Sequence, residues 1–198
     1  MMTKGEETKQ YIISVAAPIF NKHGYAATSI SDLTKATKLT KGAIYGNFKN
    51  KEELAIKAFD YNVSRLISDI RLRTTKSSTT IERLFAIIDF YRDYLDYSKK
   101  FGGCPILNVG VDANNQNTLL LDNVRKTIKK LQGYIATIIE KGIHKGEIKK
   151  EIKAIDWAIR LDTMIQGAVF MTHTMNSSLY LHNTMDQIEM IINTEMRK

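Results

Sequence analysis

Residues 28–54 read TSISDLTKATKLTKGAIYGNFKNKEEL, and this stretch predicts two short helices joined by a tight turn, followed by a third helix. Ser29 followed by Asp32 resembles a capping box, so the first of these helices is expected to begin near Ile30 and to run to about Thr37. Thr40 is the next plausible N-cap, and it opens a helix expected over residues 41–48. Only two residues separate these helices, about the length that a helix-turn-helix connection allows.

The apolar and polar residues of this stretch divide into a small core and an unusual surface. The residues expected to close the core are Ile30, Leu33, Ala36, Leu39, Ile44 and Phe48. The residues left on the surface of the second helix are Lys41, Gly42, Ala43, Tyr45, Gly46 and Asn47. An ordinary amphipathic helix would carry long charged side chains at most of these positions. Small and hydrogen-bonding residues instead favour a helix that enters a DNA groove.

The chemistry of this surface suits contacts to both base edges and phosphates. Gly42, Ala43 and Gly46 would let the helix backbone approach DNA closely, and Ala43 could touch a thymine methyl group. The Thr40 hydroxyl and the N–H groups at the helix N-terminus suit a phosphate. Side chains expected to hold neighbouring phosphates are Tyr45, Asn47 and Lys51. The alternative from local spacing is a small helical hairpin packed on the body of the protein, with glycines that merely mark loop ends.

The first sixty residues also carry a dense sequence resemblance. Its residues are Gly24-Tyr25, Thr28-Ser29-Ile30, Thr40-Lys41-Gly42-Ala43-Ile44-Tyr45, Phe48 and Asn50-Lys51-Glu52-Glu53-Leu54. This run resembles the TetR family of bacterial one-component repressors. The resemblance implies an all-helical homodimer with an N-terminal three-helix DNA-binding head and a larger C-terminal body that binds a small molecule.

The same resemblance implies which residues meet the DNA. It places Thr40, Lys41, Gly42, Ala43, Tyr45, Gly46 and Asn47 on or beside the recognition helix, Lys51 on a phosphate, and Thr28 and Ser29 at the start of the preceding helix. Many family members carry an aromatic residue or histidine where this chain has Gly46 and Asn47. The operator contacts are therefore expected to differ in detail.

Composition agrees with a DNA-binding head without proving one. The chain has 198 residues and a net charge of +8, with hydrophobic and charged contents ordinary for a globular protein. Residues 1–75 hold 12 Lys and Arg against 7 Asp and Glu, a balance of +5, whereas residues 76–198 hold 17 against 14, a balance of +3. The excess per residue is greater in the N-terminal part, as a phosphate-binding head requires. A basic balance also fits a membrane-surface protein, so it is weak support.

Other global features favour a cytoplasmic protein that does not enter a membrane. No apolar run approaches the roughly 18 residues that a membrane-spanning helix needs, and residues 1–10 lack the apolar core of a signal peptide. A single cysteine excludes an internal disulfide framework.

Beyond the head, apolar residues recur at helical spacing and predict an all-α body. Helices are expected from Lys51 to about Arg73, from Ile81 to Tyr97, from Pro105 to near Ala113, and around the stripe from Leu120 to Ile138. Two further helices are expected over 154–175 and 180–196. The expected domains are a DNA-binding domain over residues 1–50 and a ligand-binding and dimerisation domain over residues 51–198.

The last two helices predict the dimer interface. Both are apolar on more than one face, and Ile188, Met190, Ile191 and Ile192 fall within five positions. Such excess apolar surface suggests a two-fold four-helix bundle formed with a second copy, which would space two heads for successive major-groove half-sites. The alternative is a helix pair buried inside a monomer.

A candidate effector pocket lies in the body. Methionine and aromatic residues build adaptable apolar cavities, and a few polar groups would orient a ligand there. The candidate lining is Tyr91, Tyr94, Cys104, Tyr134, Trp157, Met164, Gln166, Phe170, Met171 and His173. A stripe of this kind at helical spacing is more often protein core, and the family resemblance is what favours a pocket.

Cys104 has two possible interpretations. It precedes Pro105 at an expected helix start, where the helix dipole can lower the pKa of a thiol and make it reactive. The segment GGCPILN resembles one found in a TetR-family branch that includes electrophile-responsive repressors. The other reading is a small buried hydrophobic residue.

Catalysis and metal binding are poorly supported by the sequence. The four histidines are scattered without metal-ligand spacing, and a site that joins His173 to His182 would lack an accompanying carboxylate or cysteine motif. No nucleophile elbow or phosphate-binding glycine loop is found, so no enzyme activity, cofactor or metal is expected.

The sequence thus predicts a ligand-responsive regulator that binds near-palindromic double-stranded operator DNA as a homodimer and is released by a small-molecule effector. The alternative is an all-helical small-molecule-binding or protein-interaction module without specific DNA binding.

Overall fold

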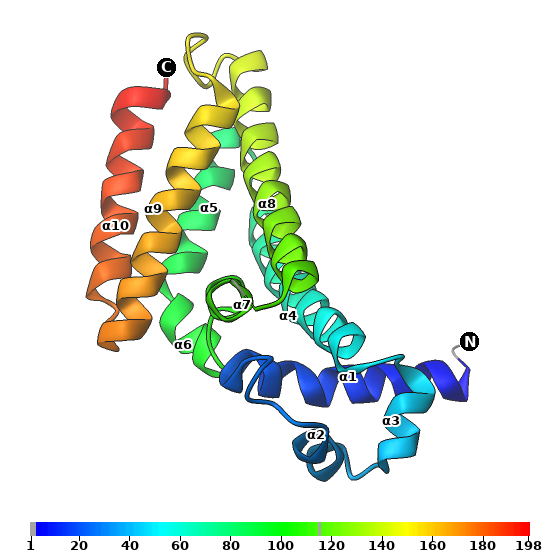
Figure 1. Cartoon of the computed structure of the whole chain (residues 1–198). Coiled ribbons are helices and arrows are strands. Elements are labelled where there is room, and N and C mark those ends of the chain that lie inside the picture. The colour runs from blue at the N-terminus through cyan, green and yellow to red at the C-terminus, as the bar shows by residue number, and fades with distance from the viewer. Residues whose placement is uncertain (1–2, 115) are drawn as a thin grey trace. The chain divides into compact units, whose positions relative to one another are not determined.

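The computed structural model describes residues 3–114 and 116–198, and the regular elements in this part of the chain are all helices. The all-α fold class is therefore confirmed. The elements, drawn in Figure 1, are α1 (Lys4–His23), α2 (Ile30–Thr37), α3 (Lys41–Asn47), α4 (Lys51–Thr74), α5 (Thr80–Arg92), α6 (Tyr94–Lys99), α7 (Pro105–Ala113), α8 (Thr118–His144), α9 (Ala154–Met175), α10 (Leu179–Ile191) and a short π-helix, η1 (Ile192–Met196).

Packing divides the chain into two compact units. The first consists of Met1–Leu66 and Lys100–Lys126, and the second of Ile67–Lys99 and Thr127–Lys198. Two of the boundaries between them fall inside α4 and α8, and the third follows the end of α6.

The first unit is built on α1, which packs against α2, α3 and α7. Its core joins residues of four helices: Ile12, Ile13, Ala16, Ala17, Phe20, Leu33, Ile44, Phe48, Leu54, Ala55 and Ala58. The expected core members Ile30 and Leu39 are partly buried against this cluster. Ala36, expected in the core, is exposed, because α2 turns Leu33 and Thr37 inward and leaves Ala36 beside that stripe.

The loop before α7 is tied to the end of α1 by paired side-chain amides. Asn21 donates from Nδ2 to the carbonyls of Phe101 and Gly103, at 2.7 and 2.9 Å. Asn108 donates back from Nδ2 to the carbonyls of Asn21 and Gly102, at 2.9 and 3.0 Å. Gly102 and Gly103 have φ angles of 82° and 108°, which residues with a Cβ rarely adopt. The two glycines therefore give the loop the shape that these bonds require.

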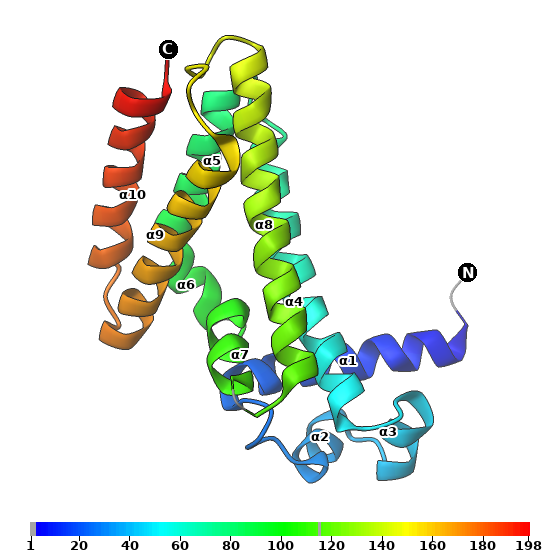
Figure 2. The same cartoon turned by 45° about the horizontal axis from the view of Figure 1, so that its top comes forward.

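In the second unit, α10 packs against α9 and α5, and α9 and α10 run side by side in Figures 1 and 2. The expected single helix from Ile81 to Tyr97 is wrong, because the chain breaks at Asp93 into α5 and α6. The break follows tertiary contacts that local spacing does not encode. His182 Nε2 lies 3.1 Å from the Arg92 carbonyl, and the Arg92 guanidinium donates to Asp186 and Glu189 of α10.

Candidate DNA-binding surface and effector pocket

The short helix α3 is held by one cap and one buried anchor. Thr40 is its N-cap, and the Thr40 hydroxyl accepts a hydrogen bond from the Ala43 N–H at 3.1 Å. Ile44 and Phe48 are 1% and 2% exposed and fix the inner side of the helix in the core of the first unit. A helix this short is unstable alone, so these contacts position its outer side.

The outer side of α3 is bare backbone at Gly42 and Gly46, beside the side chains of Lys41 and Tyr45. Lys41, Gly42, Tyr45 and Gly46 are exposed, and a Cβ built on Gly46 would have no heavy atom within 4 Å. The Asn47 side chain donates from Nδ2 to the Ala43 carbonyl at 2.9 Å, and both residues are partly buried. Lys41 Nζ lies 5.9 Å from the centroid of the Tyr45 ring, so a rigid partner can approach the helix closely beside this pair, at Gly42 and Gly46.

The start of α2 presents a second set of predicted contact residues. Ser29 and Asp32 form the expected capping box: the Ser29 hydroxyl accepts from the Asp32 N–H at 3.1 Å, and the Asp32 carboxylate accepts from the Ser29 N–H at 2.9 Å. Thr28 is 2% exposed, and its hydroxyl donates to the Gly24 carbonyl at 2.7 Å. Ser29 thus stays on the surface, whereas the Thr28 side chain is turned inward.

Lys51, at the first position of α4, stabilises the loop between α1 and α2 by hydrogen bonds to its backbone. Its ammonium donates to the carbonyls of Tyr25 and Thr28, at 2.8 and 2.9 Å. The same ammonium lies 4.3 Å from the centroid of the Tyr25 ring, a cation–π contact. An ammonium has three N–H groups, so one remains after the two carbonyls.

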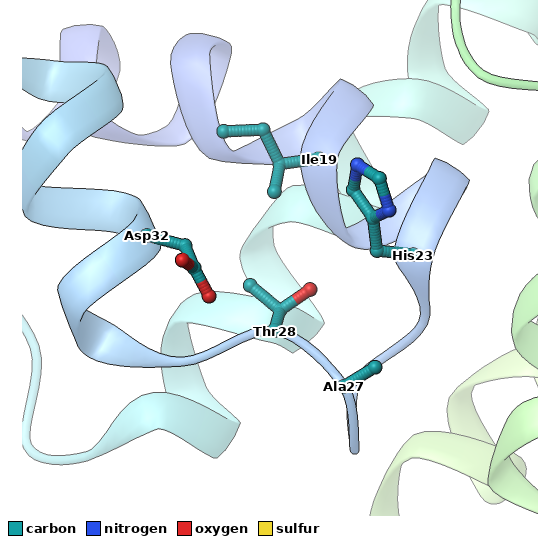
Figure 3. A pocket seen from close by; sticks show the side chains of 5 residues that line it. All are labelled: Ile19, His23, Ala27, Thr28 and Asp32. Atoms are coloured by element: carbon teal, nitrogen blue, oxygen red, sulfur yellow. The ribbon is translucent and has the colours of Figure 1, made fainter.

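A surface pocket of about 440 Å³ lies on the head between α1 and α2 (Figure 3). Its lining residues are Ile19, His23, Ala27, Thr28 and Asp32. Figure 3 shows His23 of α1 and Asp32 of α2 on opposite sides of Thr28. Hydrogen bonds from Ser29 are the main reason that the pKa of Asp32 is lowered, and so they hold a negative charge at this side of the pocket.

The body contains two adjoining small cavities, each of about 20 Å³. The inner cavity is lined by residues of α4, α5, α8 and α9: Ile70, Ile87, Tyr91, Leu131, Tyr134, Ile135, Asp162 and Ile165. The outer cavity is lined by Ile67, Ile70, Arg71, Lys130, Leu131 and Tyr134. Tyr91 and Tyr134, two of the predicted pocket residues, thus meet at one cavity.

Asp162 is the polar group of the inner cavity that sequence analysis missed. It is 5% exposed and accepts hydrogen bonds from Gln132 Nε2 at 3.0 Å and Gln166 Nε2 at 3.2 Å. Burial raises the pKa of Asp162, while these two bonds act in the opposite direction. The available signal was its position: on a helix, Asp162 falls on the stripe of Ala158 and Ile165, both buried.

Three other predicted pocket residues lie away from the lining of the cavities. Tyr94 is buried in a cluster of aromatic rings, and His173 meets it edge-on at 6.4 Å between ring centroids. The Ser98 hydroxyl is 3.0 Å from His173 Nε2, and burial, followed by the charge of Lys99, lowers the pKa of His173. Gln166 reaches the inner cavity only through its bond to Asp162.

The remaining predicted pocket residues are more scattered. Met164 and Trp157 are partly buried on α9, and the Trp157 ring lies 4.7 Å from the Arg160 guanidinium. Phe170 and Met171 are 48% and 38% exposed. Cys104 is buried, belongs to the first unit and precedes α7 as its N-cap residue.

The exposed apolar side chains of the second unit concentrate on its last two long helices. These are Ile155, Ile159, Phe170, Met171 and Met175 of α9, and Leu179 and Met190 of α10, each between 38% and 58% exposed. Exposed apolar side chains that gather on neighbouring helices mark candidate sites of association.

The described residues include neither a metal-binding cluster nor a membrane-spanning helix. No group of three or more His, Cys, Asp and Glu side chains there could hold a metal ion. Among the same residues, no helix is both long and apolar enough to cross a membrane.

A capped, nearly bare α3 on a helical core, followed by a helical body, defines a helix-turn-helix regulator of transcription. Residues 12–58 match the family described as bacterial regulatory proteins, tetR family, and residues 80–188 match the tetracyclin repressor-like C-terminal domain. The second match alone spans more than half of the chain. The chain belongs to the TetR family, and as a member it is a ligand-responsive DNA-binding regulator.

Solved structures and a curated relative agree over nearly the whole length. A TetR transcriptional regulator from Chloroflexus aurantiacus is 34% identical with a TM-score of 0.92, and 99% of each chain is covered. A TetR-family regulator from Cytophaga hutchinsonii is 32% identical with a TM-score of 0.90, over 98% of this chain and 96% of that one. The HTH-type transcriptional regulator YxaF of Bacillus subtilis is 26% identical, over 96% of this chain and 98% of its own.

Proposed function

We propose that the chain is a homodimeric repressor that reads a near-palindromic operator with α3 and leaves it when an effector binds the body. The observation that carries the proposal is the bare outer side of α3. Gly42, Ala43 and Gly46 bring the helix backbone to base edges in the major groove, where Ala43 meets a thymine methyl group. Since two of these three residues have no side chain, direct readout is shared with the shape of the groove.

Phosphate contacts surround this helix. Contacts that fix the register are assigned to Thr28, Ser29, Thr40, Lys41, Tyr45, Asn47 and Lys51. Thr28 contributes through its backbone, because its hydroxyl is bonded to Gly24. Lys51 has one N–H left for a phosphate after its two bonds to carbonyls, so its first task is to hold the α1–α2 loop in place.

The dimer forms through α9 and α10. The exposed apolar side chains of these helices support this interface, because a two-fold bundle with a second copy would remove them from water. A two-fold dimer also explains a near-palindromic operator, since each copy reads one half-site.

The two functions are assigned to two parts of the chain that meet after residue 50. Residues 1–50 bind DNA, and residues 51–198 bind the effector and form the dimer. The helix α4 links the roles, because it begins with Lys51 at the head and carries Ile70 in the wall of the inner cavity. An effector that moves Ile70 shifts α4, and the two recognition helices then lose their half-site spacing.

The place of action follows from the partner. A regulator of bacterial chromosomal DNA works in the cytoplasm, so we place the protein there. It acts through binding alone, and its role requires neither a cofactor nor a reaction.

The test is selection of bound fragments from a random duplex pool with the full chain, followed by binding titrations on the recovered sequence. We expect a near-palindromic site bound with salt-dependent affinity. A protein that prefers no duplex over a polyanionic competitor at moderate ionic strength would contradict the proposal. A screen for compounds that release the complex then tests the effector response.

A further inference from the structure

The inner cavity of the body combines apolar walls with one buried carboxylate. Its aliphatic lining comes from Ile70, Ile87, Leu131, Ile135 and Ile165, and its aromatic lining from Tyr91 and Tyr134. The carboxylate of Asp162 is the charged group in this lining. An apolar cavity with one polar group that points into it can orient a ligand as well as hold it.

Asp162 is hydrogen-bonded but has no counter-ion. Its two donors, Gln132 and Gln166, are neutral amides, and each occupies one carboxylate oxygen. Within residues 3–114 and 116–198, none of the ion pairs includes Asp162, and no cation contributes to its pKa. A carboxylate has about four acceptor positions, so two bonds leave it with capacity to accept more.

A buried carboxylate without a counter-ion costs stability. Transfer of an ionised group from water into a protein interior is unfavourable unless it is paired and hydrogen-bonded. Helix packing alone would be served by an apolar or amide side chain at this position. A cationic partner in the cavity would supply the counter-ion that Asp162 lacks.

The two tyrosines, like the carboxylate, favour a cationic partner. The face of an aromatic ring carries negative electrostatic potential and attracts cations. Tyr91 and Tyr134 approach the cavity from α5 and α8, while Asp162 approaches from α9. A cationic group in the cavity would meet the carboxylate and at least one ring together.

We propose that the effector is an apolar or aromatic molecule with one N–H-bearing cationic group, which donates a hydrogen bond to Asp162. This inference rests on the proposed function and names the chemical class of its effector. The apolar part of the molecule packs among the isoleucines and the two tyrosines.

The cavity must widen to accept such a molecule. At about 20 Å³ it has room for roughly one water. The outer cavity shares three of its walls, Ile70, Leu131 and Tyr134. The Tyr134 side chain lines both cavities, and its hydroxyl is held by the Thr74 hydroxyl at 2.8 Å. The widened space displaces Ile70 of α4, the helix that the proposed release requires to move.

The rival class is an anionic amphiphile held at the outer cavity by Arg71 and Lys130. Both side chains are exposed, so water and salt screen their charge. Asp162 is buried, where screening is much weaker. The buried carboxylate therefore outweighs the two exposed cations in the choice of ligand charge.

The test compares three probes of one shape on the full chain: 1-naphthylmethylammonium, 1-naphthalenemethanol and 1-naphthoate. Dissociation constants are measured by calorimetry at millimolar probe concentrations, and release of the selected operator is followed in parallel. We expect the ammonium to bind at least about tenfold more tightly than the alcohol, which corresponds to about 1.4 kcal/mol. The naphthoate is expected to bind more weakly than both.

Two variants locate the preference. Asp162→Asn keeps the size of the side chain and is expected to bring the ammonium-to-alcohol affinity ratio to about one. Asp96→Asn removes an exposed carboxylate from α6 and is expected to keep the wild-type ratio. If Asp162→Asn does not fold, the three-probe comparison on the wild type still tests whether the cavity prefers a cationic ligand.

Three results would overturn the inference: equal binding of ammonium and alcohol, tightest binding of the naphthoate, or no binding of the ammonium. A preference that persists in Asp162→Asn would overturn it as well. Operator binding without any probe is measured on the same samples. Its failure would count against the proposed function, whereas intact operator binding without cation preference would count against this inference alone.

Discussion

The outer side of α3 and the cavity around Asp162 are held in shape by different means. The α3 surface depends on a cap from Thr40 and an anchor at Ile44, both within four residues of the face that they position. The cavity depends on four helices, α4, α5, α8 and α9, whose lining residues span positions 70 to 165. The first surface is open and ready for a partner. The second is small, is lined by a buried carboxylate and must widen before a ligand fits.

Because of this difference, DNA binding and effector binding should have different energetic costs. DNA meets a preformed surface, so little of its binding energy is spent on rearranging the protein. An effector must displace packed side chains, and that displacement is what can reach α4. Variants at the exposed glycines of α3 should therefore change operator affinity without loss of stability, whereas variants that line the cavity should change both stability and effector affinity.

The largest effect is expected from Gly46→Glu. A carboxylate on the bare side of α3 would face the phosphates and fill the space that the groove needs, so operator affinity should fall about 100-fold or more. A Cβ at Gly46 meets no neighbour, and replacing glycine inside a helix favours the helix. The melting temperature should therefore stay equal or rise. Gel-shift titration and thermal unfolding measure the two outcomes.

The matched control for this variant is Gly133→Glu, which makes the same change on α8 where a Cβ also meets no neighbour. It should retain nearly full operator affinity. Equal losses in the two variants would mean that added charge, and not the position on α3, is responsible.

Next in size is the effect of a charge on the apolar surface of α9. Ile159 is 44% exposed, and Ile159→Asp would bury an unpaired carboxylate in the proposed dimer interface, at a cost of about 3 kcal/mol. We expect a shift from dimer to monomer in sedimentation equilibrium and a parallel loss of operator affinity. Leu72→Asp, at a 62% exposed position of α4, should leave the dimer intact. A dimer that survives Ile159→Asp would place the interface elsewhere.

A smaller effect, on both stability and binding, is expected for Lys51→Met. Loss of two charge-assisted bonds to the carbonyls of Tyr25 and Thr28 should lower the free energy of unfolding by about 1–3 kcal/mol. If the remaining N–H also binds a phosphate, the salt dependence of operator affinity should flatten by about one unit. Lys57→Met changes an exposed lysine of the same helix and should alter neither quantity strongly. An unchanged salt dependence would restrict Lys51 to its role in the loop.

The same contrast explains what the sequence could and could not predict. The capping residues Ser29 and Thr40 act within their own helices, so the bounds of α2 and the start of α3 followed from spacing alone. The break at Asp93 depends on contacts between α5 and α10, about 90 residues apart in the chain. Local periodicity does not contain that information.

The candidate pocket shows the limit most clearly. Periodicity assigned Phe170 and Met171 to the same helix as Gln166, but it could not say which face of α9 meets α8. The hydrogen bond from Gln132 of α8 to Asp162 supplies that orientation. Asp162 was overlooked because a lone aspartate on a helix is usually solvated, and only its place on a buried stripe distinguishes it.

The smallest effect is a pH dependence that belongs to the cavity and not to the head. Burial raises the pKa of Asp162 above its ordinary value of 3.8, so the folded protein holds this proton more tightly than the unfolded chain does. The contribution to stability is therefore full below about pH 3.8 and declines as pH rises through the raised folded pKa.

Asp162→Asn mimics the protonated form, so it should gain melting temperature relative to the wild type as pH rises from about 4 to about 8. Thermal unfolding of both proteins at one fixed protein concentration, because dimers are concentration-dependent, measures the difference. The charged groups that line the outer cavity, Arg71 and Lys130, are exposed. Parallel curves for the two proteins would mean that water or a rearrangement already compensates the carboxylate, and the contrast between an open head and a cavity with an uncompensated carboxylate would then disappear.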